Sequence, residues 1–378
     1  MHDDPLALLS ALVAIPSVNS DLVSGADGEA AIADACEAWL DESGFVVERL
    51  ESRPGHPSIV ATSPGSGAGR SLMLNGHLDT VGISTFAGEA FTTRISEGKI
   101  FGRGTFDMKS GLAAILVAAT RAARVPHRGD IVVALVADEE FGSSGTEDVL
   151  RHYRSDAAIV VEPSGLELTV AHRGFAWFEV QLVGRSAHGS QPDLGLDAIA
   201  GAGAILQQLE TLSTQLRSRA SHHLLGHGTV RVSKISGGVD AATVAPTCQL
   251  SIERRTLPGD NPDLIEDELR ELIAACCTPR GLGFTLTRLV ARAAFETQEG
   301  SLIVDAVVTA AVHVIGHSPA ECGEPFWTDA GLISEAGIDC LVFGVDGGGA
   351  HADEEWATVD SVVQLTDVLE RTIIDFCA

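Results

Sequence analysis

DIVVALVADEEF, at residues 130–141, is an unbroken apolar run that leads directly into acidic residues. Short, continuous runs rich in Val, Ile and Leu are typical of parallel strands whose sheet is covered on both faces by helices. Ligands of such sheets bind outside the carboxyl ends of the strands, so acids at these ends indicate a site, and a metal is the simplest reason for them. The same form recurs as SLMLNGHLDTV at 71–81, AAIVVEPSG at 157–165 and CLVFGVDGGGAH at 340–351.

Length and composition limit the kind of protein. The chain has 378 residues, which is long for one core, and 45% of them are hydrophobic, so we predict two domains with sizeable cores. A formal net charge of −27 argues against a nucleic-acid or anionic-membrane partner. No apolar run is long enough to span a bilayer, and the start, MHDDPLALLSALVAIPSV, carries acids where a signal peptide carries basic residues.

The cysteines indicate a reducing compartment. Their number, seven, is odd, none forms a C-x-x-C pair, and most lie in apolar segments. We therefore expect buried or free thiols and a cytoplasmic protein.

Two patterns divide the chain into domains. Helices expected at 5–15, 29–43 and 110–124 alternate with the apolar strands, which indicates an α/β structure with a mostly parallel sheet and helices on both faces. After Gly165 the strands alternate between apolar and polar residues, and the order becomes β-α-β-β-α-β, as in a ferredoxin-like α+β unit. The expected elements of this unit are 175–184, 197–216, 228–238, 247–257, 261–277 and 283–291.

The apolar strand pattern resumes after this unit. The ferredoxin-like unit is therefore expected to be inserted into the first domain. We predict a catalytic domain made of residues 1–170 and 292–378, with an inserted domain at 171–291.

His77 and Asp79 are the first candidate site residues. They follow an apolar strand at positions i and i+2, so both side chains face one side. A metal-bound imidazole donates its other N–H to an acceptor that fixes the ring, and a nearby carboxylate suits that role. A turn histidine beside a capping aspartate would give the same H-x-D sequence.

More acids and a second histidine follow the other expected strands. Asp107 lies in a bend before a helix, where its two oxygens could bridge two metals, although a helix-capping aspartate is common there. Glu139 and Glu140 point in opposite directions, so one can bind a metal while the other accepts a proton. Glu162 precedes a proline and His351 lies in a Gly-rich loop, and each alone is a weak signal.

Together these residues suffice for two metal ions. Two histidines and three acids can hold two ions that share one bridging carboxylate, as in hydrolases that activate water with two metals. Mixed histidine and carboxylate ligands fit Zn²⁺, with Co²⁺ or Mn²⁺ as substitutes. A purely structural zinc site does not fit, because such sites are usually closed by Cys and His.

In this order the residues resemble the di-zinc metallopeptidase family of acetylornithine deacetylase, succinyl-diaminopimelate desuccinylase, aminoacylase and glutamate carboxypeptidase. The resemblance covers nearly the whole chain. It runs through NGHLDTV, GRGTFDMKSG, ADEEFGSSG, VVEPSG, HRGFAWFEVQLVGRSAHGSQPDLGLDA, the GG at 237–238, VAP, ERRTLPG, TDA and GAH.

The resemblance implies two zinc ions that share Asp107. It also implies that Glu139 is the general base and acid, and that Asp79 orients His77. The implied ligand sets are His77, Asp107 and Glu162 for one zinc, and Asp107, Glu140 and His351 for the other.

The resemblance further implies that the inserted domain is a lid through which the chain forms a homodimer. His188, in SAHGS, would reach the partner subunit's active site and stabilise the oxyanion, although a loop histidine beside a turn would look the same. Arg255, in ERRTLPG, would bind a substrate carboxylate with its bidentate guanidinium, and its neighbour Arg254 is expected to be a surface charge. Thr243, Glu253 and the segment VDGGGAH depart from the family pattern, which leaves the acyl group and side chain of the substrate open.

The implied function is hydrolysis of the amide bond of an N-acyl amino acid by zinc-activated water. The nearest alternative is a dipeptidase or a glutamate-type carboxypeptidase with the same metal centre. A non-catalytic metal-binding dimer is a further alternative, but such proteins usually lose the base or a ligand, and all are present here. The expected partners are a small N-acyl amino acid or short peptide and a second copy of the chain.

Overall fold

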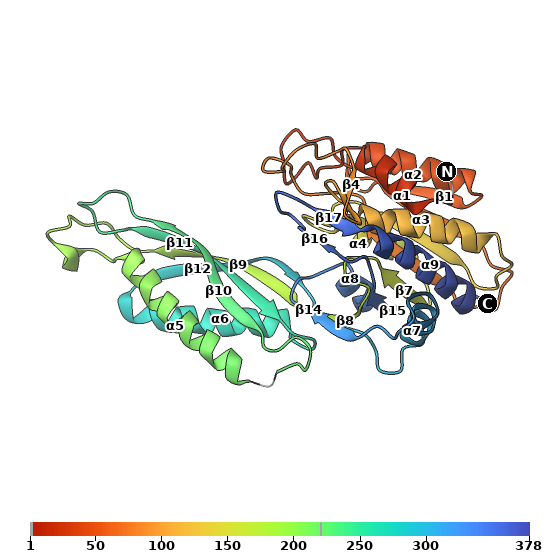
Figure 1. The fold of residues 1–378 in the computed structure, drawn as a ribbon. Helices are drawn as coiled ribbons and strands as arrows, with labels where there is room; N and C mark the ends of the chain where they lie inside the picture. Colours follow the sequence, from red (N-terminus) through yellow and green to blue (C-terminus); the bar gives the residue numbers. More distant parts are fainter. Residues whose placement is uncertain (1–2, 220) are drawn as a thin grey trace. The chain divides into compact units, whose positions relative to one another are not determined.

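The chain forms two compact units in the computed structural model, which describes residues 3–219 and 221–378 (Figure 1). Each unit has its own hydrophobic core, and the second is inserted into the sequence of the first. The first unit consists of Met1–Val170, Thr297–Cys322 and Thr328–Ala378, and the second of Ala171–Glu296 and Gly323–Trp327.

The first unit is built around a mixed sheet whose four central strands are parallel. Every residue of β3 (Leu72–His77), β6 (Ile131–Val136) and β7 (Ala157–Val160) is buried. Parallel strands covered on both faces need apolar side chains in both directions, which explains the unbroken apolar runs. The strand order is β1 (Val46–Leu50), β2 (Ser58–Ser63), β6, β3, β7, β15 (Asp339–Val342) and β8 (Leu168–His172), with β1, β2 and β8 antiparallel to their neighbours.

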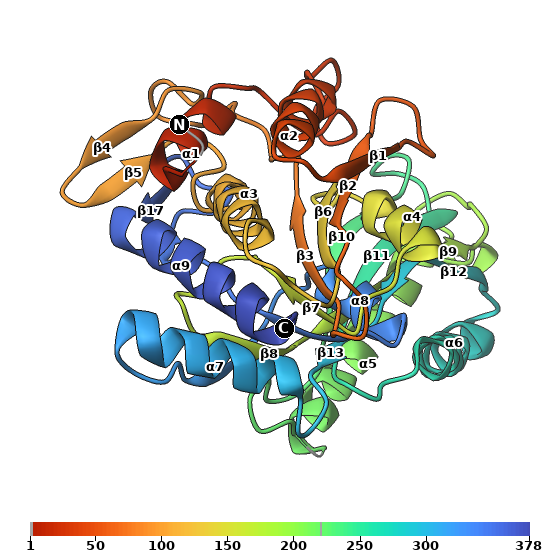
Figure 2. The same cartoon turned by 90° about the vertical axis from the view of Figure 1, so that its right-hand side faces the viewer.

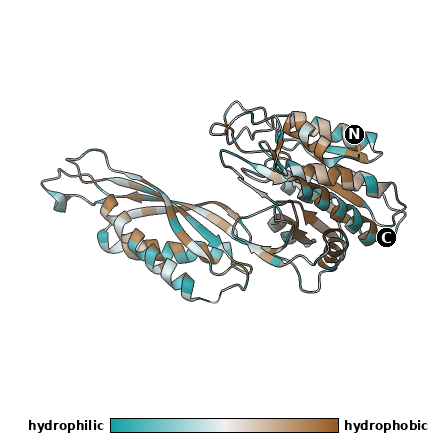
Figure 3. Ribbon diagram, in the orientation of Figure 1, coloured by the Kyte–Doolittle hydropathy of each residue, from teal (hydrophilic) through white to brown (hydrophobic). Residues whose placement is uncertain are grey.

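Helices cover both faces of this sheet (Figure 2), whose strands are coloured mostly as hydrophobic in Figure 3. Nearly all residues of α3 (Lys109–Ala123) are buried, because it lies on the sheet beneath other helices. A helix that is apolar on all sides is stable only inside such a layer. One face carries α1 (Pro5–Val13), α2 (Ala30–Glu42), α3, α7 (Leu302–Ile315) and α9 (Val359–Phe376), and the other carries α4 (Ser144–His152) and α8 (Ala330–Glu335).

A small antiparallel sheet in the first unit brings two distant loops together. Its register pairs Phe101 with Trp356. The segment that contains Asp107 follows the first of these residues, and the loop that contains His351 precedes the second. The strands are β4 (Arg94–Ser96), β5 (Lys99–Phe101), β17 (Trp356–Thr358) and β16 (Gly347–Gly348), in the order β16-β17-β5-β4.

The second unit has the β-α-β-β-α-β order expected from the sequence. Its antiparallel strand order, β10-β11-β9-β12, is that of a ferredoxin-like unit. The buried residues of β9 alternate with more exposed ones, because one face of the sheet packs on two helices. The elements are β9 (Gly174–Val183), α5 (Ala198–Ser218), β10 (Thr229–Gly237), β11 (Thr247–Thr256), α6 (Pro262–Cys277) and β12 (Gly283–Arg292), with the short strands β13 (Phe295–Glu296) and β14 (Glu321–Glu324) paired to β8.

The predicted fold class is confirmed. The central strands are parallel and helices lie on both faces, as the apolar runs indicated. Within the described residues, no helix is both long and apolar enough to cross a membrane. None of the seven cysteines, all of which lie in the described ranges, forms a disulfide, and six are buried.

Candidate metal centre

The candidate metal ligands and the candidate general base lie in the first unit and come from five segments. β3, β6 and β7 are parallel strands of one sheet, with β3 between the other two, so their carboxyl ends meet at one edge. The small antiparallel sheet brings two further loops beside that edge. The residues are His77 at the end of β3, Glu139 and Glu140 after β6, Glu162 after β7, Asp107 before α3, and His351 between β16 and β17.

Asp107 lies between the two histidines. His77 Nε2 is 3.0 Å from Asp107 Oδ1 and 3.5 Å from Glu162 Oε1. His351 Nε2 is 3.4 Å from the other oxygen, Asp107 Oδ2, and 3.0 Å from Glu140 Oε2. Each oxygen of Asp107 therefore faces a different histidine–glutamate pair. A carboxylate that bridges two cations needs this arrangement.

The main chain fixes the ring of His77. Its Nδ1 is 2.9 Å from the backbone carbonyl oxygen of Asp79, and a carbonyl only accepts, so Nδ1 carries the hydrogen. Nε2 is thereby left to face the carboxylates, as in metal-binding histidines. The carboxylate of Asp79, which we expected to orient the ring, is farther from Nδ1, at 3.5 Å.

The Asp79 carboxylate holds the turn that carries the two glutamates. It accepts the main-chain N–H groups of Glu139 and Glu140, each at 3.1 Å. Asn19 Nδ2 donates to the same carboxylate at 2.8 Å and to Asp138 at 3.2 Å. Asn19 and Asp138 were not among the predicted site residues. No sequence signal pointed to Asn19, because it is 60 residues from Asp79.

The buried acids shift one another's pKa values. Burial, and then the charge of Glu162, raises the pKa of Glu139 well above its usual range. Burial also raises the pKa of Glu162, and burial with the nearby Asp107 raises that of Glu140 to about 7. Hydrogen bonds with Asp107 and Glu140 raise the pKa of His351 to about 10. The centre concentrates more negative charge than its histidines balance, so protons or cations must compensate it.

Two divalent cations fit this donor set. Glu140 Oε1 is buried and has no hydrogen-bond partner within the described residues, which is costly unless it coordinates a cation. Ligand atoms of His77, Asp107 and Glu140 lie within 4.8 Å of one another, as do those of His77, Glu139 and Glu162. Imidazole nitrogens with carboxylate oxygens suit Zn²⁺, and Co²⁺ or Mn²⁺ can replace it.

In protein from which metal has been removed, the stability of the folded state should decrease as the pH rises. The pKa of Glu140 is about 7 in the folded state, above its ordinary value of 4.5, so the folded protein binds more protons than the unfolded chain between these values. Stability is therefore lost as the pH rises through this interval. The pKa of His351 is raised from 6.5 to about 10, so this residue causes a further decrease in stability at higher pH. Thermal unfolding of chelator-treated protein at about pH 5 and about pH 8 measures the effect.

Glu140→Gln is the matched control for this pH experiment. Its amide does not titrate, so its chelated form should lose less stability over the same interval. Added Zn²⁺ should reduce the pH dependence of the unfolding temperature in the unsubstituted protein. A chelated protein whose unfolding temperature stays constant or rises with pH would contradict the assignment.

A second group of acids, also in the first unit, is already neutralised by an arginine. Asp21, His56 and Asp138 have ligand atoms close together. The guanidinium of Arg53 pairs with both aspartates, at 3.1 Å from Asp138 Oδ2, and His56 Nδ1 is 3.1 Å from Glu29 Oε1. Because arginine supplies the positive charge, we assign no metal to this group.

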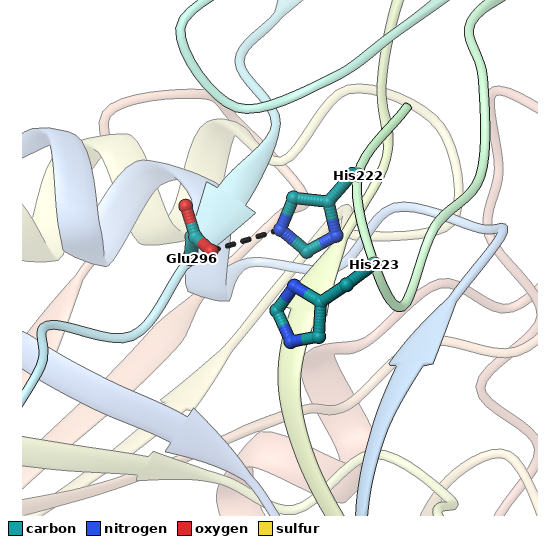
Figure 4. A group of neighbouring side chains, drawn as sticks. All are labelled: His222, His223 and Glu296. Atoms are coloured by element: carbon teal, nitrogen blue, oxygen red, sulfur yellow. Dashed lines mark hydrogen bonds and ion pairs between the residues drawn. The ribbon is translucent and has the colours of Figure 1, made fainter. Parts of the chain in front are cut away.

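A third group, in the second unit, contains His222, His223 and Glu296 (Figure 4). The main-chain N–H groups of Leu224 and Leu225 both donate to His222 Nδ1 at 3.2 Å, so this nitrogen carries no hydrogen. The hydrogen is therefore on Nε2, which donates to Glu296 Oε1 at 2.8 Å. A metal at Nε2 would leave the ring with no hydrogen, whereas metal-bound histidines normally donate from their other nitrogen. This group instead fastens a loop to β13.

His188 and Arg255 lie in the second unit. His188 is exposed, and its Nδ1 accepts the N–H of Ser190 at 3.2 Å, so Nε2 carries the hydrogen and is a donor. Arg255, on β11, is half-buried. Its Nη2 is 2.9 Å from Glu253 Oε1, and its guanidinium carbon is 5.4 Å from the centre of the Phe175 ring.

Arg254 is not the surface charge that we expected from the sequence. Only 3% of it is exposed, because strand alternation places it on the same face as the core residue Ile252. Its Nη1 donates to the carbonyl oxygens of Thr229 at 3.2 Å and Arg255 at 2.8 Å. An arginine is tolerated there because main-chain oxygens accept from its buried guanidinium.

Comparisons with known proteins give one family and several relatives. The model of the family described as peptidase family M20/M25/M40 matches residues 73–375. Acetylornithine deacetylase of Myxococcus xanthus is 31% identical over 91% of each chain. Succinyl-diaminopimelate desuccinylase of Stenotrophomonas maltophilia is 30% identical over 97% of this chain and 98% of that protein. The crystal structure of aminopeptidase PepT from Bacillus cereus has the same fold, with a TM-score of 0.83, 19% identity, and coverage of 100% of this chain and 99% of that one.

Proposed function

Because this chain belongs to the M20/M25/M40 peptidase family of metal-dependent hydrolases, we propose that it hydrolyses the amide bond of an N-acyl amino acid. Its relatives named acetylornithine deacetylase and succinyl-diaminopimelate desuccinylase support this substrate class. The observation that carries the proposal is the position of Asp107, whose two oxygens face different histidine–glutamate pairs.

We assign the metal ligands as two sets that share Asp107. When bound, two divalent ions would supply Lewis acidity, which lowers the pKa of a water molecule and polarises the scissile carbonyl. Zn²⁺ is the ion that the donor set favours. The sets are His77, Asp107 and Glu162, and Asp107, Glu140 and His351.

Glu139 is the proposed general base and acid. Its side chain is half-buried beside His77 and Glu162, and it does not belong to either proposed ligand set. It would accept a proton from the attacking water and donate one to the leaving amine. The hydrogen bond from its main-chain N–H to Asp79 would hold it in place during both transfers.

Arg255 is proposed to bind the substrate's α-carboxylate. We expect Arg255→Ala to raise KM by about 10–100-fold, because hydrogen bonds to a charged group contribute about 1.5–3 kcal/mol. Steady-state kinetics on an N-acetyl amino acid and on its α-amide measure this, since the amide lacks the carboxylate and should show little change.

Arg231→Ala is the matched control for Arg255. Arg231 also pairs with Glu253, so its removal breaks the same kind of ion pair. An equal rise of KM in both variants, or an equal rise on the acid and the amide, would exclude direct binding of the carboxylate by Arg255.

We also propose that the second unit forms a homodimer in which His188 acts in the partner's site. The supporting observations are that β10 is an edge strand of its sheet and that Ile199, Leu206 and Ile235, on α5 and β10, are exposed apolar residues. Unprotected strand edges pair readily with a second chain.

Subunit mixing tests this role of His188. The His188→Ala and Glu139→Gln variants should each be nearly inactive. After the two variants are mixed and their subunits exchange, half of the dimers should contain one chain of each kind. Each mixed dimer has one complete site, which combines the intact Glu139 of one chain with the intact His188 of the other. About one quarter of the normal activity should therefore return. A mixture that stays inactive, or a fully active monomer, would refute action in the partner's site.

The alternative is a peptidase with the same metal centre. It is favoured by the fold shared with an aminopeptidase. Product analysis with N-acetyl, N-succinyl and N-formyl amino acids and with dipeptides separates the two activities. Turnover of N-acyl amino acids supports the deacylase, and turnover of dipeptides alone supports the peptidase.

Cysteines that form no disulfide suit the compartment that we expected from the sequence. None of the seven cysteines, which all lie in the described ranges, forms a disulfide, and most are buried. We infer a reducing cytoplasm, where such thiols persist.

A further inference from the structure

We propose that Glu355, paired with Arg103, is a positioning residue that holds Asp107 where it can bridge two cations. The inference rests on the proposed function and deepens it. Both side chains are almost completely buried, each with 1% of its surface exposed. Neither belongs to the proposed ligand sets, and the sequence predicted no role for either, although Arg103 lies in the GRGTFDMKSG motif.

The carboxylate of Glu355 organises the loop that contains Asp107. Its Oε1 accepts the main-chain N–H groups of Phe106 and of Asp107 itself, both at 2.9 Å. Its Oε2 accepts the N–H of Gly104 at 2.9 Å and Nη1 of Arg103 at 2.7 Å. A carboxylate has about four acceptor directions, and all are used by this one short loop.

Arg103 connects this loop to the segment that contains His351. Its Nη2 donates to the carbonyl oxygen of Ala352, the residue after His351, at 3.0 Å, and to that of Gly82 at 3.3 Å. The N–H of Gly102 donates to the main-chain oxygen of Glu355 at 3.2 Å. The ion pair therefore links the loops of two proposed ligands that are far apart in the sequence.

Stability alone is a weak reason for such an ion pair. A buried ion pair is often no more stabilising than apolar residues of similar volume, because both charges lose their hydration. Partners that hold a ligand in place do change metal affinity, typically by about 10–100-fold. Because Asp107 faces both cation positions, its displacement would weaken both.

Metal titration of Glu355→Gln tests the inference. The amide has nearly the same shape, but it replaces one acceptor oxygen with a donor, so two of the four hydrogen bonds are lost. We expect the affinity for both Zn²⁺ ions, measured against a chromophoric chelator, to fall by about 10–100-fold. The visible absorption of the Co²⁺-loaded protein should also change, because the ligand geometry changes.

Leu116→Ala is the control for general destabilisation. It removes packing from the fully buried centre of α3 in the same unit, and it should lower the unfolding temperature without changing metal affinity. Arg103→Lys is a second test variant that keeps the positive charge but loses the forked guanidinium, and it should weaken both ions in the same way.

Three outcomes decide the matter. Reduced affinity in both Glu355→Gln and Arg103→Lys, with normal affinity in Leu116→Ala, supports the inference. Unchanged affinity in a folded test variant, or an equal loss in Leu116→Ala, overturns it while leaving the proposed function intact. An unsubstituted protein that fails to bind two Zn²⁺ or Co²⁺ ions overturns the inference and the proposed function together.

Discussion

Glu139→Gln should lower kcat by about 10²–10⁴-fold, which is the usual contribution of a positioned general base. The amide has the same shape as the carboxyl but cannot accept the proton. The main-chain hydrogen bond from residue 139 to Asp79 does not involve the side chain, so the turn should stay in place. Steady-state kinetics at saturating substrate, with elemental analysis of the same sample, measure both the rate and the metal content.

Two further results make the Glu139 experiment decisive. Glu299→Gln, at an exposed position in the same unit, should have normal activity and metal content. Turnover of Glu139→Gln within a fewfold of normal would show that another group accepts the proton. Loss of a metal ion would instead show that Glu139 is a ligand, since its oxygens lie close to His77 and Glu162.

Asp107→Ala should remove both metal ions, whereas His351→Ala should remove mainly one. Among the proposed ligands, Asp107 is the residue whose two oxygens face the two histidine–glutamate pairs, so its loss takes a ligand from each cation. His351 faces Glu140 and one oxygen of Asp107. Elemental analysis after equal washing should give two ions for the unsubstituted chain, about one for His351→Ala and almost none for Asp107→Ala. Activity should fall to the background of the assay in Asp107→Ala.

Asp305→Ala is the control for the metal experiment. This exposed aspartate at the start of α7 should leave both ions bound. Retention of two ions by Asp107→Ala would contradict the role of Asp107 as a ligand shared by both cations. Equal losses in Asp107→Ala and His351→Ala would mean that the two cation positions cannot be filled independently.

The parallel core was predictable because its physical requirements appear directly in the sequence. Strands covered on both faces must be apolar throughout, so β3, β6 and β7 appear as unbroken runs. Parallel neighbours bring their carboxyl ends together, so His77 and Glu162 could be expected at one edge. The roles assigned to these residues remain predictions until the variants are measured.

The residues that support the centre, such as Glu355 and Asn19, were not predictable, because their partners are distant in sequence. Glu355 lies in HADEEW, which looks like an exposed acidic loop, yet its partners are about 250 residues away. Asn19 precedes the first expected strand, and nothing local indicates that it binds Asp79. Arg254 was wrongly predicted for a related reason. Strand alternation predicts which face of the sheet a residue lies on, but it does not predict whether nearby carbonyl oxygens can accept hydrogen bonds from a buried guanidinium.

Chelator-sensitive amine release is the measurement that tests the central claim most directly. Protein of known metal content would be assayed with N-acetyl, N-succinyl and N-formyl amino acids, first with Zn²⁺ or Co²⁺ and then with chelator. We expect turnover of at least one N-acyl amino acid, its loss with chelator, and its return when metal is restored. Turnover that is indifferent to chelator, or no turnover in protein that holds two ions, would contradict the account.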